Sequence, residues 1–412
     1  MRIGIDAHFL EKHYGGLTTF LKGILKEIPE IDKSNEYFLF FRSRKPARLT
    51  INYPITQLPN YPITKYHFTL WFNFVLPRQL KEYNIDLFFS PNHFLPLPFN
   101  SFRVNSSGQA FKTVVVIHDL AWKINPEWKN PSFRVYAELF QKKAIQRADK
   151  IIVDSESTRR DVMKYYRDSM VNSVGASVDN SIEKKIEVVY LAAEERFKPR
   201  ITTNYPSSVA VPLLRRTGKS NYEYTNLRKI KKKHSLPEDF ILYVGRIEKR
   251  KNIQGIIEIA KEISKLDRFK ELKFILFGPI GPGGNQFLDI IRNAKNIQYK
   301  GVAEEKDLPY IYNLAKIFLF PSFYEGFGIP PLEAMQSGLP VLTSNTSSLP
   351  EVLGQGGLMH DPKDYEGFAK DITRLLEENE FYQEMRKKGI EQAKNFSWRK
   401  SAEKLVTMFN GI

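Results

Sequence analysis

The chain has 412 residues, of which 42% are hydrophobic and 13% aromatic, so it is long and apolar enough for two domains with packed cores. It contains no cysteine, which excludes disulfides, thiolate metal sites and cysteine nucleophiles. Its formal net charge of +16 favours an acidic ligand or surface, but the sequence contains no nucleic-acid-binding module and no apolar segment long enough to span a bilayer.

The first part of the chain alternates strand and helix patterns. Apolar side chains recur at helical spacing from Thr18 to Ile28, and a second helical pattern ends near Ala148. Because the strands are continuous apolar runs, we expect a parallel sheet covered by helices on both faces. Since a strand pattern already begins at Arg2, no signal peptide is expected. The predicted strands are Arg2–Asp6, Tyr37–Phe41, Asp86–Ser90, Thr113–Ile117, Lys150–Val153 and Lys185–Tyr190.

Two stretches allow more than one interpretation. Residues 199–236 lack clear periodicity, and we assign them to an interdomain linker with an insertion, because so long a loop is unusual inside a compact domain. The linker is basic and forms either a solvated surface or a patch that contacts an anionic membrane. The aromatic stretch Tyr66–Phe74 either packs against the first sheet, which we prefer, or lies on a membrane. The basic residues of the linker include Arg215, Arg216, Lys219 and the run Arg228–Lys233.

A second alternating set of patterns begins at Phe240. The expected domains are therefore residues 1–198 and residues 237–397, each a doubly wound α/β domain in which ligands bind beyond the carboxyl ends of the strands. The predicted strands are Ile241–Val244, Lys273–Phe277, Ile297–Tyr299, Phe318–Phe320 and Pro340–Thr343, and the later helices are Asp364–Glu378, Glu380–Lys394 and Trp398–Phe409.

Two glutamates follow the strand Phe318–Phe320, in the stretch Tyr324-Glu-Gly-Phe-Gly-Ile-Pro-Pro-Leu-Glu333. Glu325 falls in a glycine-rich turn, and Glu333 lies about one turn into a helix that a proline can open. Carboxylates accept hydrogen bonds from neighbouring hydroxyls, so the pair can bind a polyol. The backbone N–H groups in the turn are expected to form a rim suited to an anion, and they belong to Gly326, Phe327, Gly328 and Ile329.

With Pro321-Ser-Phe before it and Ala-Met after it, this stretch resembles the signature of the family 4 retaining glycosyltransferases. The similarity covers most of the chain and is strongest from Ile241 to Pro362. It implies the glycosyltransferase B fold, in which two Rossmann-like domains face each other across a cleft and a last segment, residues 398–412, packs back on the first domain. It also implies that Glu325 contacts the sugar of a nucleotide-sugar donor and that Glu333 binds the ribose hydroxyls.

Arg246 and Lys251 lie between a predicted strand and the next helix, where two fixed cations can stabilise the charge that develops on a leaving diphosphate. In the pattern Gly-Arg-x4-Lys-Asn they are similar to the diphosphate-binding pair of the family. The neighbouring Lys249 and Arg250 leave open which cations are involved. Such a site requires no metal, and the sequence has no Asp-x-Asp cluster.

The resemblance implies further contacts in both domains. Gly15 and Gly16, in a turn after the first strand, would contact the diphosphate, since glycine allows close approach of the backbone. His118 would contact the donor sugar at the end of a very apolar strand. The weaker candidates for acceptor contact are His8 and Asp119, and the residues expected near the nucleotide are Gly278 and Ile297. The glycine pair is not the Gly-x-Gly-x-x-Gly fingerprint, so no dinucleotide cofactor is expected.

By overall likeness to the mannosyltransferase branch, these features predict a cytoplasmic, metal-independent hexosyltransferase without a cofactor. It would move mannose from GDP-mannose to a glycan or lipid-linked saccharide in cell-surface polysaccharide synthesis, with peripheral contact to an anionic membrane as a further expectation. The alternatives are a UDP-sugar donor, a nucleotide-sugar epimerase and a non-catalytic nucleotide-sugar-binding protein. One departure bears on the donor, because many relatives carry Gly-Val-Asp where this chain has Leu191-Ala-Ala-Glu194.

Overall fold

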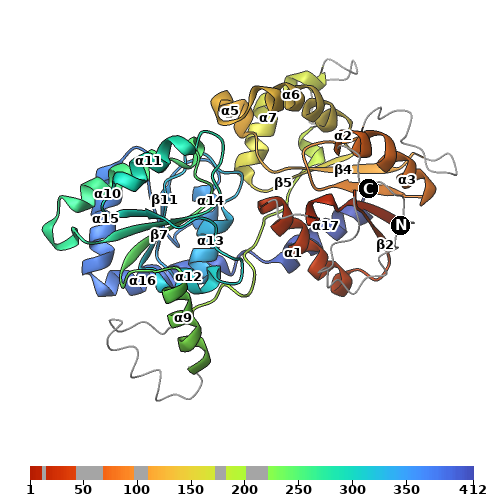
Figure 1. Ribbon diagram of the computed structural model, residues 1–412. Helices are drawn as coiled ribbons and strands as arrows, with labels where there is room; N and C mark the ends of the chain where they lie inside the picture. The colour runs from red at the N-terminus through yellow and green to blue at the C-terminus, as the bar shows by residue number, and fades with distance from the viewer. Residues whose placement is uncertain (12–14, 43–67, 97–109, 172–181, 201–220) are drawn as a thin grey trace. The chain divides into compact units, whose positions relative to one another are not determined.

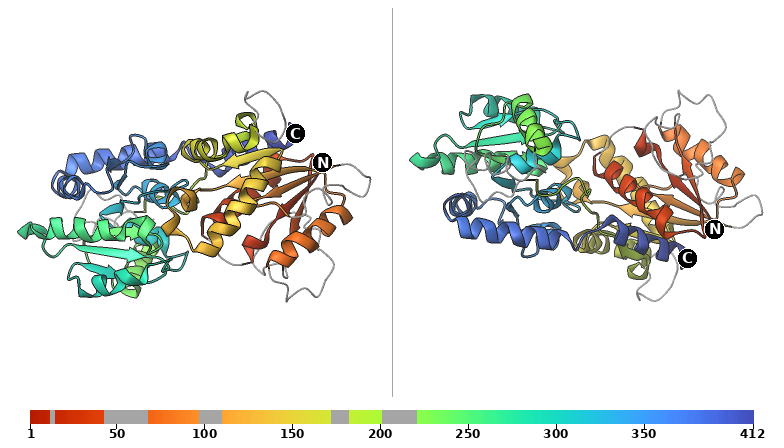
Figure 2. Two further views of the ribbon diagram at one scale, coloured as in Figure 1. Left: turned by 90° about the horizontal axis from the view of Figure 1, so that it is seen from above. Right: turned by 90° about the horizontal axis from the view of Figure 1, so that it is seen from below.

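The computed structural model describes residues 1–11, 15–42, 68–96, 110–171, 182–200 and 221–412. Its contacts divide the chain into two compact units, Met1–Ala192 with Ser397–Ile412, and Ala193–Phe396. Within the described residues each unit contains one six-stranded sheet covered by helices (Figure 1; Figure 2). Both units are therefore Rossmann-like α/β domains, which confirms the fold class that the alternating patterns predict.

The first sheet has the strand order β2-β1-β3-β4-β5-β6 among the described residues, and every pairing is parallel. Apart from their first residues the strands are almost entirely buried, which explains the continuous apolar runs in the sequence. Because the strands are parallel, the residues that follow them meet at one edge of the sheet. The strands are β1 (Arg2–Asp6), β2 (Glu36–Phe40), β3 (Leu87–Ser90), β4 (Lys112–Ile117), β5 (Lys150–Val153) and β6 (Ile186–Val188).

The helices of the first unit form two layers. Helix α17 (Trp398–Asn410) packs against α1 (Gly16–Ile31), and a Cβ atom on Gly23 would lie 2.2 Å from the ring of Trp398, so only glycine allows this approach. Right-handed crossover connections place α6 and α7, which follow β4 and β5 in the chain, on the opposite face of the sheet. That layer contains α2 (Phe68–Leu70), the π-helical turn η2 (Trp71–Val75), α3 (Leu76–Glu82), α6 (Pro131–Arg147) and α7 (Glu156–Val171); shorter elements are η1 (His8–Leu10), α5 (Ala121–Ile124), η3 (Pro126–Trp128) and η4 (Glu183–Lys185).

The aromatic stretch around η2 divides between core and surface. Trp71 and Phe72 are each 1% exposed and belong to the core cluster of the first unit, as the preferred interpretation predicts. Leu70 and Phe74 are 46% and 50% exposed. Tyr66 and His67 lie outside the described residues.

The second sheet has the order β12-β11-β10-β7-β8-β9 in the described part of the unit, again with parallel pairings. Its strands are β7 (Phe240–Val244), β8 (Lys273–Phe277), β9 (Ile297–Tyr299), β10 (Ile317–Phe320), β11 (Val341–Ser344) and β12 (Leu358–His360). Its helices are α9 (Asn221–Lys233), α10 (Ile253–Ser264), α11 (Asn285–Asn293), α12 (Leu308–Leu314), α13 (Ile329–Gln336), α14 (Leu349–Leu353), α15 (Tyr365–Glu377) and α16 (Asn379–Ala393), with short turns η5 (Lys249–Lys251) and η6 (Asp267–Phe269).

The boundary between the units differs from the expected one. The first unit gives way to the second after Ala192 rather than after residue 198, and the expected linker 199–236 includes α9, which packs against α12 of the second unit. The basic residues Arg215, Arg216 and Lys219 lie outside the described residues. Within the part of the chain that the structure describes, no helix combines the length and the hydropathy needed to cross a membrane.

Candidate functional site

The glycine-rich turn between β10 and α13 is held by two serines from the loop that follows β11. The backbone N–H of Glu325 donates to Ser347 Oγ at 2.8 Å, and Ser348 Oγ donates to the carbonyls of Glu325 and Phe327 at 3.0 and 2.6 Å. Gly328, at φ +119°, caps α13 in a conformation that favours glycine. These contacts fix the carboxylate of Glu325 at the carboxyl edge of the sheet.

The rim of backbone donors expected from Gly326 to Ile329 does not extend further into helix α13. Helix α13 begins at Ile329, and Pro330 and Pro331, which lack N–H groups, occupy its next two positions. Leu332 already donates its N–H within the helix, to the carbonyl of Gly328. At the start of this helix Ile329 is therefore the backbone donor that an anion can reach.

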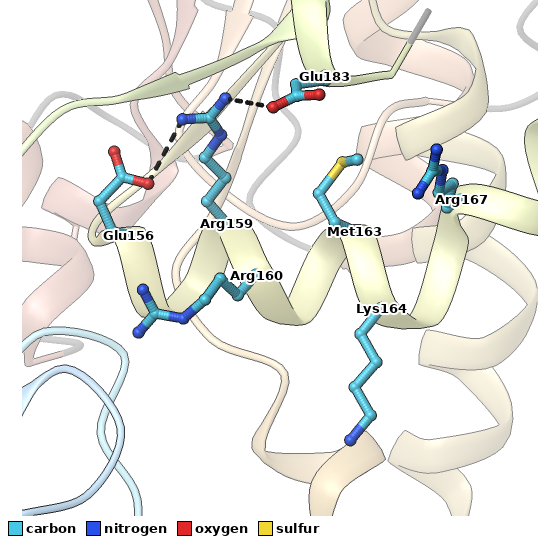
Figure 3. Close-up of a pocket in the computed structure, with 7 residues that line it drawn as sticks. All are labelled: Glu156, Arg159, Arg160, Met163, Lys164, Arg167 and Glu183. Atoms are coloured by element: carbon cyan, nitrogen blue, oxygen red, sulfur yellow. Dashed lines mark hydrogen bonds and ion pairs between the residues drawn. The ribbon is translucent and has the colours of Figure 1, made fainter. Parts of the chain in front are cut away.

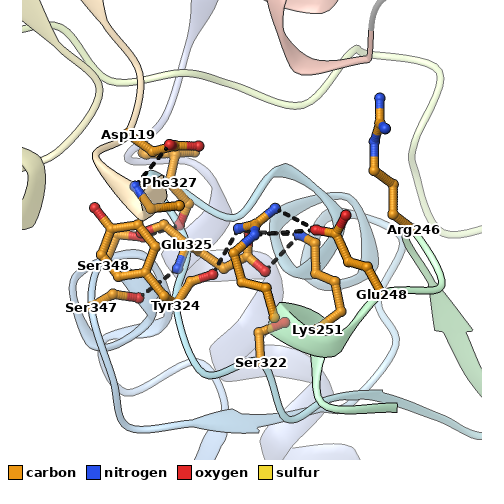
Figure 4. Close-up of polar contacts among 12 residues, drawn as sticks. Asp119, Arg246, Glu248, Lys251, Ser322, Tyr324, Glu325, Phe327, Ser347 and Ser348 are labelled. Carbon is orange, nitrogen blue, oxygen red and sulfur yellow. Dashed lines mark hydrogen bonds and ion pairs between the residues drawn. The ribbon is translucent and has the colours of Figure 1, made fainter. Parts of the chain in front are cut away.

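The central interaction of the site is an ion pair between Lys251 and Glu325. Lys251 Nζ lies 2.6 and 2.7 Å from the two carboxylate oxygens of Glu325, and the two residues are 8% and 6% exposed (Figure 4). The position of Lys251 is set by Asn252, whose backbone is left-handed at φ 54° and whose Nδ2 donates to the carbonyls of Pro321 and Pro362. Lys251 and Glu325, separate in the sequence, thus share one buried site.

Arg250 joins this pair and extends it into a cluster of four charges. Its guanidinium lies 3.3 Å from Glu325 and 3.0 Å from Glu248, and it donates to the carbonyl of Tyr324 at 2.8 Å. The backbone carbonyl of Arg250 accepts from the N–H of Phe323. Arg250 therefore binds the turn that carries Glu325 through both backbone and side chain. Of the two neighbouring cations that the sequence left open, Lys249 and Arg250, it is Arg250 that contacts Glu325.

The charges of the cluster determine the state of Glu325. Burial by itself would raise the pKa of this carboxyl, but Lys251 and Arg250 outweigh it and lower the pKa below the ordinary value. Glu325 is accordingly ionised at neutral pH, with its charge offset by two cations. An ionised carboxylate accepts hydrogen bonds only, which suits it to the hydroxyl groups of a sugar.

Arg246 does not join the cluster. It follows β7, is exposed, and its side chain points away from Lys251 and Glu325 (Figure 4). Its backbone carbonyl accepts a hydrogen bond from Tyr243 Oη at 2.8 Å, so its own position is fixed while its guanidinium faces solvent. The structure thus separates the two cations that the sequence pairs, one buried and one exposed.

Glu333 lies one turn into α13 and is chemically different from Glu325. Tyr312 Oη donates to Glu333 Oε2 at 2.9 Å. Burial raises the pKa of Glu333 to about 8, and Glu194 and Glu305 add to the effect, whereas the hydrogen bond from Tyr312 and the charge of Arg196 offset only part of it. At neutral pH Glu333 is largely protonated and can both donate and accept hydrogen bonds, which matches the vicinal hydroxyls of a ribose.

The loop after β8 packs backbone to backbone against the loop after β7. A Cβ atom on Gly278 would lie 1.9 Å from the carbonyl oxygen of Gly245, and one on Gly284 would lie 1.9 Å from that of Ile247. This contact explains why residues 278–284 are rich in glycine. Ile297, which was expected near the nucleotide, is 3% exposed and lies at the start of β9. It is therefore away from the carboxyl edge of the sheet, where ligands bind in such folds. Tyr299, at the end of β9, donates to the carbonyl of Gly278.

In the first unit, His118 is held by two hydrogen bonds. Its Nδ1 lies 2.6 Å from Asp154 Oδ2 and its Nε2 lies 3.0 Å from the carbonyl oxygen of Pro91. Burial opposes a charge on His118, but Asp154 outweighs burial and raises the pKa of the imidazole. Since both ring nitrogens face hydrogen-bond acceptors, the charged form of His118 is favoured, and a sugar contact through its side chain requires one of these bonds to open.

The other predicted residues of the first unit lie at the same edge of the sheet. His8 Nδ1 lies 2.6 Å from Asp6 Oδ1, and Asn92 Nδ2 donates to the other oxygen of Asp6 at 2.9 Å. Asp119 follows His118 and accepts the N–H of Ala121 at 3.1 Å. Gly15, at φ +67°, caps α1, which begins at Gly16, and no atom of the described residues outside its chain neighbours lies within 4 Å of the place where its Cβ would stand.

The two parts of the chain match two family models. Residues 14–171 match Glycosyltransferase Family 4, and residues 226–395 match Glycosyl transferases group 1. The chain belongs to the family 4 glycosyltransferases. This glycosyltransferase has the glycosyltransferase B fold, shared with Anabaena HepE in complex with UDP-glucose, at a TM-score of 0.67 and 14% identity over 100% of both chains.

Among curated proteins the glycosyltransferase resembles the mannosyltransferase branch. It is 28% identical over 335 residues to O-antigen chain mannosyltransferase B of Escherichia coli, which is 80% of this chain and 75% of that protein. It is 29% identical over 313 residues to the serotype-specific mannosyltransferase WbdA of Escherichia coli, which is 73% of this chain and 34% of WbdA. The alignment therefore spans about a third of the length of WbdA.

Several residues of the glycosyltransferase site were not identified from the sequence. Asp6 and Asp154 are not among the candidates named from the sequence, yet each binds a candidate histidine. The signal that could have found them is the one that found His118: a polar residue directly after a buried parallel strand. Ser347 and Ser348 carry no such signal, because they act on the turn of Glu325 from a loop whose position depends on the folded sheet.

Proposed function

We propose that this glycosyltransferase is a retaining enzyme that transfers mannose from GDP-mannose to a glycan or lipid-linked saccharide in the synthesis of a cell-surface polysaccharide. The observation that carries the proposal is the buried pair of Lys251 and Glu325 beneath the glycine-rich turn. The donor assignment is supported by the names of its relatives, an O-antigen chain mannosyltransferase and a serotype-specific mannosyltransferase.

The proposed chemistry assigns a role to each charge. Two hydrogens of the Lys251 ammonium are directed to Glu325, and the third is left to bind the diphosphate of the donor. Arg246, exposed on the same loop, supplies a second cation as negative charge develops on the leaving group. Because both oxygens of Glu325 are bound to Lys251, this carboxylate is better suited to orient the sugar than to attack it.

Metal independence is part of the proposal. It is supported by the fixed cations Lys251, Arg250 and Arg246, which can offset the diphosphate charge in place of a divalent ion. Within the described residues, no group of three or more His, Asp and Glu side chains is arranged to hold a metal. Transfer should remain within a few-fold of its starting rate in EDTA, and loss of activity that Mg²⁺ or Mn²⁺ restores would contradict this assignment.

A UDP-sugar is the second candidate donor, because the fold neighbour HepE binds UDP-glucose. A thermal-shift panel of GDP-mannose, UDP-glucose and UDP-N-acetylglucosamine separates the donors, since only a ligand that binds the folded state raises the midpoint. We expect GDP-mannose to give the largest shift, and a shift with UDP-sugars alone would overturn the donor assignment. Incubation of radiolabelled donor without acceptor then distinguishes slow hydrolysis by a transferase from isomerisation by an epimerase or binding without turnover.

A further inference from the structure

Helix α7 of the first unit exposes a row of cations. Arg160, Lys164 and Arg167 follow one another at intervals of four and three residues, so they share one side of the helix. Val162 and Tyr166, on the other side, are 0% and 2% exposed. Within the described part of the chain, the ion pairs of this helix's cations are those of Arg159, which lies 3.4 Å from Glu156 and 3.1 Å from Glu183.

The three exposed cations line a surface pocket of about 600 Å³ along α7, together with Glu156, Arg159, Met163 and Glu183 (Figure 3). The pocket holds four cations and two carboxylates, so it keeps a net charge of +2, and both carboxylates are bound to Arg159 rather than to the other three cations. Like charges three and four residues apart on a helix repel one another. An anion in this pocket would relieve that repulsion, and arginine binds phosphate oxygens well.

Helix α6, which packs against α7 on the same face of the sheet, exposes apolar side chains next to further cations. Val135 is 62% exposed and Leu139 is 53% exposed, one turn apart. Lys142 and Lys143 follow one turn later on the same side, whereas Ala137 and Ala144 on the other side are buried. Exposed apolar residues flanked by lysines are typical of surfaces that lie on a lipid bilayer.

The same layer of helices exposes a second apolar pair, Leu70 and Phe74, before α3. These two residues are four apart and thus on one side of their helical segment. Among the described residues of the first unit, four exposed large apolar side chains belong to the layer formed by α2, η2, α3, α6 and α7. None of those described belongs to the layer of α1 and α17. This difference between the two layers indicates that the first one contacts an apolar partner.

The basic run of the second unit is different, because two of the three lysines at residues 231–233 form ion pairs. Lys231 lies 2.5 Å from Glu238, and Lys233 is bound to Glu304 and lies 2.6 Å from Asp307. These three lysines, part of the patch that the sequence offered for membrane contact, thus hold less uncompensated charge than α7. They provide a matched control with the same number of positive charges.

We propose that the helical face formed by Arg160, Lys164 and Arg167 of α7 with Val135 and Leu139 of α6 docks on an anionic bilayer. Lipid head-group phosphates would enter the pocket along α7, and the apolar side chains of α6 would reach the boundary with the acyl chains. This docking rests on the proposed function in one respect, because the docked face would bring the enzyme to a lipid-linked acceptor.

Vesicle co-sedimentation tests the proposal, with phosphatidylcholine vesicles that contain or lack phosphatidylglycerol. We expect the full chain to bind only the anionic vesicles and to be released by salt. The triple variant R160Q/K164Q/R167Q should bind on the order of 100-fold more weakly, given roughly fivefold per cation at the surface. The control K231Q/K232Q/K233Q removes the same charge and should bind like the parent chain.

A second variant, V135S/L139S, should lose a smaller part of the binding, and the part that remains should be more sensitive to salt. Equal losses in the two triple variants, or no binding to anionic vesicles at low salt, would overturn the proposal. Displacement by inorganic pyrophosphate at matched ionic strength would also overturn it, in favour of a soluble anion. The thermal shift with GDP-mannose, measured on the same variants, should not change, so a failure here is distinguishable from a failure of the donor assignment.

Discussion

Buried charges gather at the carboxyl edge of both sheets, but the two sets are neutralised in different ways. In the second unit the partners of Glu325 are Arg250, whose guanidinium keeps its charge, and Lys251, whose pKa is lowered by burial against the opposing charge of Glu325. In the first unit the partner of Asp154 is His118, and histidine changes its charge near neutral pH. The second unit therefore includes a permanent cation suited to a diphosphate, whereas the charge of the first unit's pair depends on pH.

The comparison is tested most strongly at the cations of the second unit. Lys251→Ala should lower kcat by about 10²–10³, as expected for one electrostatic stabiliser, and should lower the free energy of unfolding by about 3 kcal/mol, because it leaves the buried Glu325 with Arg250 as its remaining partner. Arg246→Ala should lower kcat in the same range without loss of stability, since this residue is exposed. Steady-state kinetics and urea unfolding measure both effects. Near-normal turnover in both variants would remove these residues from the site.

The two glutamates should separate turnover from binding. Glu325→Ala should reduce kcat far more than it weakens binding of GDP, because Glu325 faces the sugar in the proposed arrangement. Glu333→Ala should weaken GDP binding, by on the order of tenfold for one lost hydrogen-bonding group, because it removes the ribose contact. Calorimetry of GDP binding and initial rates distinguish the two. The reverse pattern would show that the roles are exchanged, even within the same family.

Glu333 gives the second unit a dependence of stability on pH between 4.5 and about 8. Its pKa is raised from 4.5 to about 8, so between these values the folded state holds a proton that the unfolded state has lost. Stability should therefore fall as the pH rises from 4.5 to 8, by on the order of 2 kcal/mol after screening. Glu333→Gln should abolish this fall, as measured by urea unfolding at pH 5 and pH 8. An unchanged slope would refute the raised pKa.

His118 should contribute a smaller effect in the first unit. Its pKa is raised above 6.5 by Asp154, so the stabilisation is fully present below pH 6.5 and is lost as the pH rises through the higher folded value. Asp154→Asn should remove this part of the pH dependence, because the imidazole then loses the carboxylate that favours its charged form. Unfolding followed in the Glu333→Gln background isolates the contribution of His118. If the Asp154→Asn variant keeps the parent slope above pH 6.5, the ion pair does not control stability.

Much of the fold could be predicted because buried parallel strands leave continuous apolar runs in the sequence. The predicted strands Arg2–Asp6, Lys150–Val153, Lys273–Phe277 and Ile297–Tyr299 have the observed bounds. Strand β12 was not predicted, because it is short and only partly buried at the edge of the sheet, so its pattern is weak. Helix α9 was assigned to a linker, because its residues are mostly polar and basic and its amphipathic pattern is faint.

The site was less completely predictable, because its partners come from distant segments. The pattern Gly-Arg-x4-Lys identified Lys251, but the contact of both Lys251 and Arg250 with Glu325, 74 and 75 residues later, depends on the order of the strands in the sheet. His118 and Asp154 are 36 residues apart and meet only because β4 and β5 are adjacent. A sequence motif identifies each of these residues separately, whereas the charge state of each residue depends on its partner in the folded structure.

The packing of α17 on α1 bears on the order in which the chain becomes structured during synthesis. Trp398 fills the space above Gly23, and Leu405 and Phe409 complete the same layer, yet the ribosome makes these residues after the whole of the second unit. At roughly 5–20 residues per second the delay is on the order of ten seconds or more. During that time Phe20 and Ile24 of the nascent first unit lack their cover, while Ala193–Phe396 is continuous and can fold as soon as it emerges. The domain that is translated first is therefore the one that is finished last.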